Sequence, residues 1–95
     1  MTAPRKLRGI GMTIFITHFE AFAELRRRQG IAQYCIAKNI SNEAGAAIRA
    51  GYMEQVLKNK ELLEDCLSYI IYHAKKVSAE HREKAKRLLS EMSRP

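Results

Sequence analysis

The fold is decided by the stretch Glu24-Leu-Arg-Arg-Arg-Gln-Gly30-Ile-Ala-Gln33-Tyr-Cys-Ile-Ala37-Lys-Asn-Ile-Ser41, which runs on to Ile48-Arg-Ala-Gly51. Gly30 predicts the end of a basic helix, because glycine is the usual left-handed residue beyond a helix C-terminus. A short helix over residues 31–38 follows, and Asn39 and Ser41 mark a turn. Ser41 can cap a third helix over residues 42–50, which ends before Gly51. The stretch therefore predicts consecutive helices and no strand.

Upstream of this stretch, the pattern predicts an arm followed by a helix. Residues 1–11 combine Pro4, Gly9 and Gly11 with three basic side chains, which is typical of a flexible segment. The β-branched and aromatic residues 12–16 predict a short strand or an extended lead-in. Residues 1–16 are therefore expected to form a basic arm and lead-in. Thr17-His-Phe-Glu20 has the spacing of a capping box and predicts a helix over residues 17–29.

Downstream, the pattern predicts one long helix and one further helix. Apolar residues from Met53 to Val77 recur at alternating three- and four-residue steps, which predicts a central helix over about residues 52–77. This apolar stripe is broader than one small domain needs, so we expect part of it to form a homodimer interface. The alternative is that the whole stripe packs on the preceding helices. Ser78 can cap a last helix over residues 79–92. The predicted fold is an all-α compact bundle of four to five helices, with residues 17–95 as a single domain.

Composition narrows the class of protein. With 95 residues and 46% apolar side chains, the chain suffices for one domain and is too apolar to be disordered. Its longest strongly apolar run, Ile14-Phe-Ile, is far below the roughly 20 residues that a membrane span needs, so we expect a cytoplasmic protein. The net charge is +7, with a basic excess in residues 1–38 and 68–95 and an acidic middle. Such a charge favours nucleic acid or an acidic protein surface as the partner.

The sequence contains no catalytic pattern. His18, His73 and His81 stand at no diagnostic spacing from a nucleophile or a carboxylate, and there is no phosphate-binding glycine loop. Cys35 and Cys66 lie within amphipathic helical patterns, so we expect two reduced core thiols. A disulfide or a shared metal site is the alternative for the cysteines. We therefore predict a protein that is not an enzyme and that has no cofactor and no metal.

Residues 24–51 resemble the helix-turn-helix of the lambda-repressor/Cro type. The matching positions are Leu25-Arg26, Gly30-Ile31-Ala32-Gln33, Ile36-Ala37, Ile40-Ser41 and Ile48-Arg-Ala-Gly51. The turn lacks the glycine expected between Asn39 and Ile40, and the helix that would read DNA offers mainly short side chains and one carboxylate. Base readout requires long polar or basic side chains. DNA contact would fall to Gln33, Asn42 and Arg49, so a DNA-binding regulator is the alternative function and nucleic acid is not the favoured partner.

The whole chain is similar to the small derepression proteins of satellite phages. Its size and helical content carry this resemblance, together with the runs Thr17-His-Phe-Glu-Ala-Phe-Ala-Glu-Leu-Arg-Arg-Arg-Gln-Gly30 and Ile48-Arg-Ala-Gly-Tyr-Met-Glu-Gln-Val-Leu57. The resemblance implies an antirepressor in a bacterial host. Such a protein binds the repressor of a helper phage and removes it from its operator.

An antirepressor of this kind needs a protein-binding surface. We expect that surface on the exposed part of the central stripe, at Leu67 and Ile70, with Tyr69 and Tyr72 as aromatic anchors. The three arginines 26–28 (Arg26, Arg27 and Arg28) would face an acidic patch of the partner and mainly raise the association rate. A small inhibitor of other host or phage machinery would present the same kind of surface.

Overall fold

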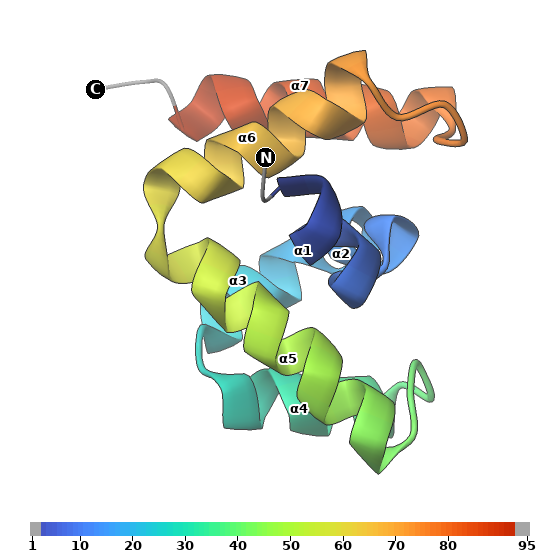
Figure 1. Ribbon diagram of the computed structural model, residues 1–95, viewed down its shortest axis with the longest axis vertical. Helices are drawn as coiled ribbons and strands as arrows, with labels where there is room; N and C mark the ends of the chain where they lie inside the picture. The colour runs from blue at the N-terminus through green and yellow to red at the C-terminus, as the bar shows by residue number, and fades with distance from the viewer. Residues whose placement is uncertain (1–2, 93–95) are drawn as a thin grey trace.

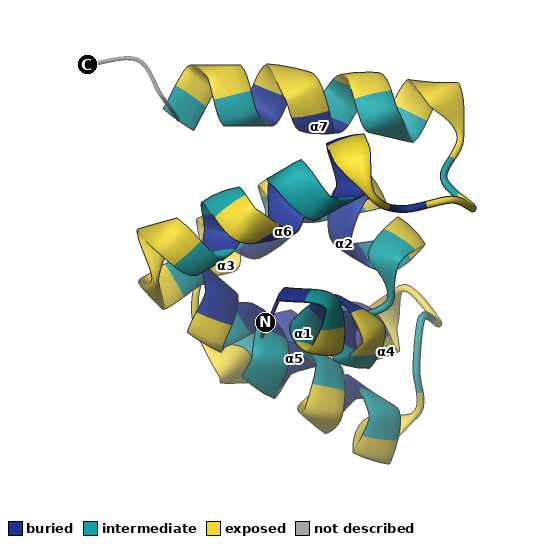
Figure 2. Cartoon of the chain, turned by 45° about the horizontal axis from the view of Figure 1, so that its top comes forward, coloured by how far each residue is buried: buried dark blue, intermediate teal, exposed yellow. Residues whose placement is uncertain are grey.

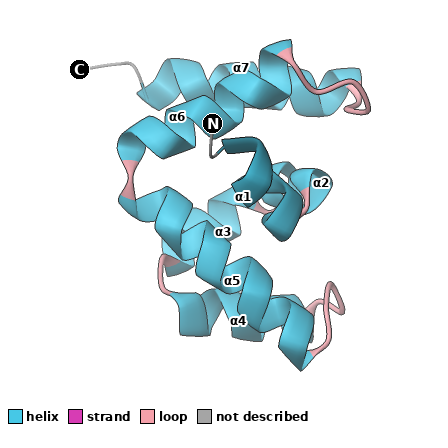
Figure 3. Cartoon of the chain, viewed as in Figure 1, coloured by secondary structure: helices cyan, strands magenta, loops and turns pink. Residues whose placement is uncertain are grey.

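The computed structural model describes residues 3–92, and every regular element in that range is an α-helix (Figure 1, Figure 3). The helices are α1 (Ala3–Ile10), α2 (Met12–Thr17), α3 (Phe19–Leu25), α4 (Arg28–Ala37), α5 (Glu43–Lys58), α6 (Lys60–Tyr72) and α7 (Ala79–Met92). The all-α prediction is confirmed. The chain is divided into more and shorter helices than the four to five that we expected, because several breaks are decided by contacts between distant residues.

The first helix corrects the expectation of a basic arm. Within α1, Ala3, Leu7 and Ile10 follow helical spacing and are buried, and the helix packs on α5 and α6. Proline is tolerated in the first turn of a helix, where its missing N–H has no partner to lose, so Pro4 does not break α1. Gly11 has φ +92°, a conformation that favours glycine, and it separates α1 from α2. The predicted strand or extended lead-in over 12–16 is therefore wrong, because these residues are helical.

The predicted helix over residues 17–29 is wrong at both ends. Thr17 is the last residue of α2, and its hydroxyl lies 3.3 Å from Nε2 of His81 instead of capping α3. α3 ends at Leu25, and α4 has already begun at Arg28, so Gly30 lies inside a helix. The early start of α4 has a tertiary cause, because the backbone N–H of Arg28 donates a hydrogen bond of 2.8 Å to the Glu54 carboxylate.

The predicted central helix over residues 52–77 is wrong. α5 runs through Gly51 without interruption and ends at Lys58. Asn59 then separates α5 from α6, because its side-chain oxygen accepts a hydrogen bond of 3.1 Å from the N–H of Leu62 and so caps the new helix. The cap of α5 is Asn42 instead of Ser41, since Asn42 Oδ1 accepts a hydrogen bond of 2.8 Å from the Gly45 N–H. The Ser78 cap of the last helix is confirmed, because the backbone N–H of His81 donates a hydrogen bond of 3.1 Å to the Ser78 hydroxyl.

The hydrophobic core lies between α1, α2, α5 and α6, with α4 packed on α5 and α7 packed on α6 (Figure 1). Figure 2 shows the burial of each helix, with buried residues on the inner side of α6 and exposed ones along the outer side of α7. Most of the broad apolar stripe is buried within the chain itself, while Leu57, Leu62 and Val77 are half-buried, and the homodimer stays a prediction. No helix within residues 3–92 is both long enough and apolar enough to cross a membrane.

Candidate protein-binding surface

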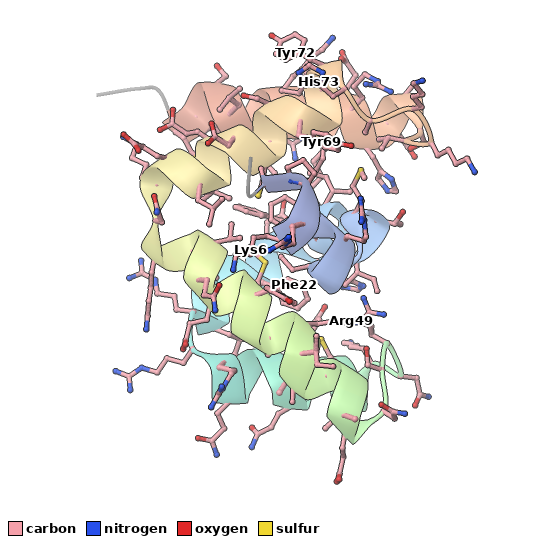
Figure 4. The ribbon with its side chains drawn as sticks, viewed as in Figure 1. Lys6, Phe22, Arg49, Tyr69, Tyr72 and His73 are labelled. Atoms are coloured by element: carbon pink, nitrogen blue, oxygen red, sulfur yellow. The ribbon has the colours of Figure 1, made fainter. Side chains whose placement is uncertain are left out.

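Arg49, one of the three predicted DNA contacts, is engaged within the fold. Its Nε donates a hydrogen bond of 2.6 Å to the Ser41 hydroxyl, and its Nη1 donates to the carbonyl oxygen of Ile10 at the end of α1. The side chain is half-buried (Figure 4). Arg49 therefore ties α5 to α1 and to the turn before α5. Because its guanidinium is bound within the fold, Arg49 does not extend into solvent as a base-reading side chain would, which corrects its assignment as a DNA contact.

After its exposed first residue, Glu43, the outward side of the first half of α5 carries apolar and mostly short side chains. Ala44 and Ala47 are exposed, and Ile48 is 57% exposed. Of the two other predicted DNA contacts, Asn42 is exposed but uses its side-chain oxygen to cap α5, while Gln33 is exposed on α4. Base edges are read by side chains that extend several atoms from the helix. The outward side of α5 offers an apolar surface for a protein and little for base readout.

The predicted contact residues on α6 divide into buried and exposed positions. Leu67 and Ile70 are fully buried in the core, so their prediction as partner contacts is wrong. The spacing of apolar residues along α6 cannot distinguish its buried positions from its exposed ones, because α6 is covered by α1 on one side and by α7 on another. Tyr69 is half-buried and its ring lies 5.8 Å from that of His73, whereas Tyr72 is 73% exposed at the end of α6 (Figure 4).

Of the predicted arginines 26–28, Arg26 and Arg27 form a tight turn between α3 and α4, and Arg28 begins α4. The N–H of Arg27 donates a hydrogen bond of 2.6 Å to the carbonyl of Leu25, and Arg26 between them has φ 62° and ψ −41°. An i→i+2 hydrogen bond around a residue of positive φ and negative ψ defines the strained form of the γ-turn. All three arginines are exposed. The same Arg28 N–H that begins α4 is the main cause of the lowered pKa of Glu54.

A groove of about 480 Å³ lies beside this turn. Its apolar lining comes from Phe19 and Ala23 of α3, Leu57 of α5 and Leu63 of α6, and its charged lining is Arg26, Arg27 and Lys58. Sequence reasoning found the arginines but missed the rest of the groove. The signal was absent from any linear pattern, because the lining residues of α3 and of the turn after it lie about thirty to forty-five positions before those of α5 and α6.

A second hollow, of about 680 Å³, is lined by Thr17 and by residues of α7. Its charged residues are of both signs and all lie on α7: Glu80, Glu83, Lys84 and Arg87. Lys84 is already paired, since its Nζ lies 2.8 Å from the Glu20 carboxylate. Charges of both signs give this hollow no preference for a partner of one sign, so the groove beside Arg26 is the stronger candidate.

The two cysteines belong to the core instead of to a site. Both Cys35 and Cys66 are free and fully buried, as expected for small hydrophobic residues. Burial raises the pKa of the Cys66 thiol to about 12, and burial likewise raises the pKa of Cys35 against the opposing charge of Arg49. The thiolate, which is the reactive and metal-binding form, is thus disfavoured in both residues. Within residues 3–92, no three metal-ligating side chains gather.

Comparison of the chain with protein-family models, with curated proteins and with solved structures finds no match in any of the three.

Proposed function

We propose that this protein is a phage-type transcriptional antirepressor, which binds a repressor protein and relieves repression by protein–protein contact. The observation that carries the proposal is the outward side of α5. The helix that would have to read DNA presents Ala44, Ala47 and Ile48 there, and the one long basic side chain in its first half, Arg49, is held by Ser41 and Ile10. An apolar helical surface suits a protein partner, while DNA offers it few complementary groups.

The charge of the molecule supports an acidic protein partner. Arg26 and Arg27 are exposed next to a groove with an apolar lining, and Tyr72 is an exposed aromatic side chain on α6. Arginine and tyrosine are enriched among the residues that dominate protein interfaces. In the proposed complex the arginines steer association with the partner, and apolar contacts determine how slowly the complex dissociates.

The proposed mechanism is mass action between two states of the repressor. If the protein binds DNA-free repressor about a hundredfold more tightly than operator-bound repressor, the coupling free energy is about 2.7 kcal/mol. By reciprocity the operator affinity of the repressor falls by the same factor when the protein is bound. No chemical step and no cofactor is needed for this mechanism.

The test has two steps, which are the capture of a partner protein and the release of that partner from an operator duplex. The protein is immobilised and exposed to lysate of a bacterial lysogen, with and without nuclease, and captured proteins are identified by mass spectrometry. A captured repressor is then purified, and fluorescence anisotropy follows its release from a labelled operator duplex as the protein is added. The proposal expects dose-dependent release, and expects capture to survive nuclease.

The DNA-binding alternative makes the opposite prediction. The protein itself would bind a duplex with an affinity that falls steeply between low and physiological salt, because phosphate contacts release counterions. Capture would be lost after nuclease treatment, and Gln33→Ala would weaken duplex binding, since Gln33 is exposed on α4. Such a result would replace the antirepressor with a helix-turn-helix regulator.

A further inference from the structure

We propose that the groove beside Arg26 is the docking site for an acidic, amphipathic segment of a partner protein. In the complex, apolar side chains of that segment cover the apolar floor of the groove, and its carboxylates bind the cations on the rim. The inference deepens the proposed function, on which the identity of the partner as a repressor rests. The chemistry of the segment follows from the groove itself, whose lining contains four apolar and three cationic residues and no acidic one.

The floor of the groove keeps some apolar surface exposed to solvent. Phe19 and Leu63 are each 8% exposed, the highest values among the buried apolar residues, and Ala23 and Leu57 beside them are half-buried. A groove of about 480 Å³ lies within the range of roughly 300–1,000 Å³ that ligand-binding sites occupy. An apolar side chain seated there would remove the remaining apolar surface from water, which is favourable in proportion to the area covered.

The rim of the groove is positively charged and largely unpaired. Neither Arg26 nor Arg27 makes a side-chain hydrogen bond or an ion pair with any residue of the described range 3–92. Lys58 has a 74% exposed side chain, and its contact with Glu54 is an i,i+4 pair of 3.7 Å, which is weak at the surface. Guanidinium groups bind carboxylates through two parallel hydrogen bonds, so this rim is complementary to an acidic segment.

The backbone at Arg26 provides an independent argument. The γ-turn places a residue other than glycine at φ 62° and ψ −41°, where glycine would be free of strain. The turn is held on both sides, since the Arg26 N–H donates to the Phe22 carbonyl at 2.8 Å and the Arg28 N–H donates to Glu54 at 2.8 Å. Strained backbone positions concentrate at ligand-binding sites. An arginine at a position suited to glycine is explained if its guanidinium is needed on the rim.

A nucleic acid would be complementary to the cationic rim of this groove but not to its apolar floor. Phosphates could contact Arg26, Arg27 and Lys58, but the sugar–phosphate backbone has no apolar side chain for the floor formed by Phe19 and Leu63. A peptide that carries leucine, isoleucine or phenylalanine beside aspartate or glutamate fits both parts. The apolar floor therefore favours the protein segment over nucleic acid.

The test uses selection from a library of short random peptides displayed on phage, with the full-length protein as bait. The expected consensus has carboxylates next to one or two large apolar residues. A synthetic, fluorescein-labelled peptide of the selected sequence is then titrated with variant proteins. Arg26→Glu/Arg27→Glu should weaken its binding about tenfold or more, the loss expected when at least one charge-assisted contact is removed. The control Lys75→Glu/Lys76→Glu changes the charge equally at two exposed residues outside the groove, and it should change affinity less than about twofold, as screened surface charges do.

A third variant separates binding from folding. Arg26→Gly removes one rim cation and relieves the strained backbone, so its melting temperature should be no lower than that of the wild type while peptide binding weakens. The inference is overturned if selection yields no acidic consensus, or if both charge-reversed variants lose affinity equally. It is also overturned if a duplex of about 20 base pairs binds the wild type and is lost from Arg26→Glu/Arg27→Glu.

The peptide selection and the operator assay can fail separately. The selection contains no repressor and no operator, so its failure overturns the groove chemistry and leaves the proposed function in place. Conversely, a protein that binds acidic peptides in the groove but captures no repressor would retain the docking site and lose the proposed function.

Discussion

Gly9 offers the sharpest test of the packing of the first helix. It lies on α1 against the aromatic ring of Tyr52 on α5, and a Cβ atom added at Gly9 would overlap Cδ2 and Cε2 of that ring and lie 3.2 Å from its Cγ. The ring is also held by Lys6, whose Nζ lies 4.9 Å from the ring centroid. Gly9→Ala therefore forces the ring or the whole of α1 to move.

The size of the effect follows from two opposing terms. Alanine is favoured over glycine inside a helix by about 1 kcal/mol, which would stabilise the variant. Inserting a methyl group into occupied space costs about 1–3 kcal/mol, and displacement of the ring also weakens its cation–π contact with Lys6, worth about 0.5–1 kcal/mol. The expected net loss is about 1–2 kcal/mol of the free energy of unfolding. For a domain of this size each kcal/mol lowers the melting temperature by about 4–8 °C.

The assay is urea unfolding followed by circular dichroism, with Gly51→Ala as the matched control. A Cβ atom at Gly51 would meet only Cδ of Arg28 at 3.7 Å, an ordinary contact inside α5, so this variant should gain about 0.5–1 kcal/mol. In a double-mutant cycle, Tyr52→Ala should remove most of the cost of Gly9→Ala. A Gly9→Ala variant as stable as Gly51→Ala would refute the reasoning, since it would mean that α1 does not pack on Tyr52.

Three further predictions concern a cap and two titrating groups. Asn59→Ala should lower the free energy of unfolding by about 1 kcal/mol, because the cap on the Leu62 N–H is lost. A higher free energy of unfolding in urea would instead indicate a continuous helix across this position, where alanine is favoured. The pKa of His18 is lowered by burial and then by Lys38 and Lys84, so below about pH 6.5 the unfolded chain binds the proton more readily than the folded protein. Stability should therefore fall as the pH drops through this range, and His18→Asn should reduce that fall when urea midpoints are compared at about pH 7.5 and about pH 5.5. Because burial raises the pKa of Cys66 to about 12, Ellman's reagent should react with the thiols only after unfolding, and stability should fall above about pH 8.5, where the unfolded chain loses the thiol proton first. Rapid reaction of the folded protein near pH 8 would contradict this burial.

The helical class and the last helix could be predicted from the sequence, because both depend on local signals. Apolar residues at three- and four-residue spacing predicted helices from residue 17 onward, and Ser78 stands where its hydroxyl caps α7. Both cysteines are buried, as their helical spacing indicated. The exposed arginines 26–28 were also identifiable, since a run of charged residues at a helix end is visible in the sequence itself.

Tertiary structure alone decided the start of α4, the packing of α1 and the groove. Glu54 sets the start of α4 from 26 positions away, and Arg49 binds the end of α1 across 39 positions. In the sequence alone Gly9 indicates flexibility, whereas in the structure it lies against the ring of Tyr52. In each of these contacts, a partner that is distant in sequence binds a backbone group or fills a space. Local helix propensity depends only on neighbouring residues, so it cannot predict such a partner. The same reason hides the groove, whose apolar floor exists only once α3, α5 and α6 are packed together.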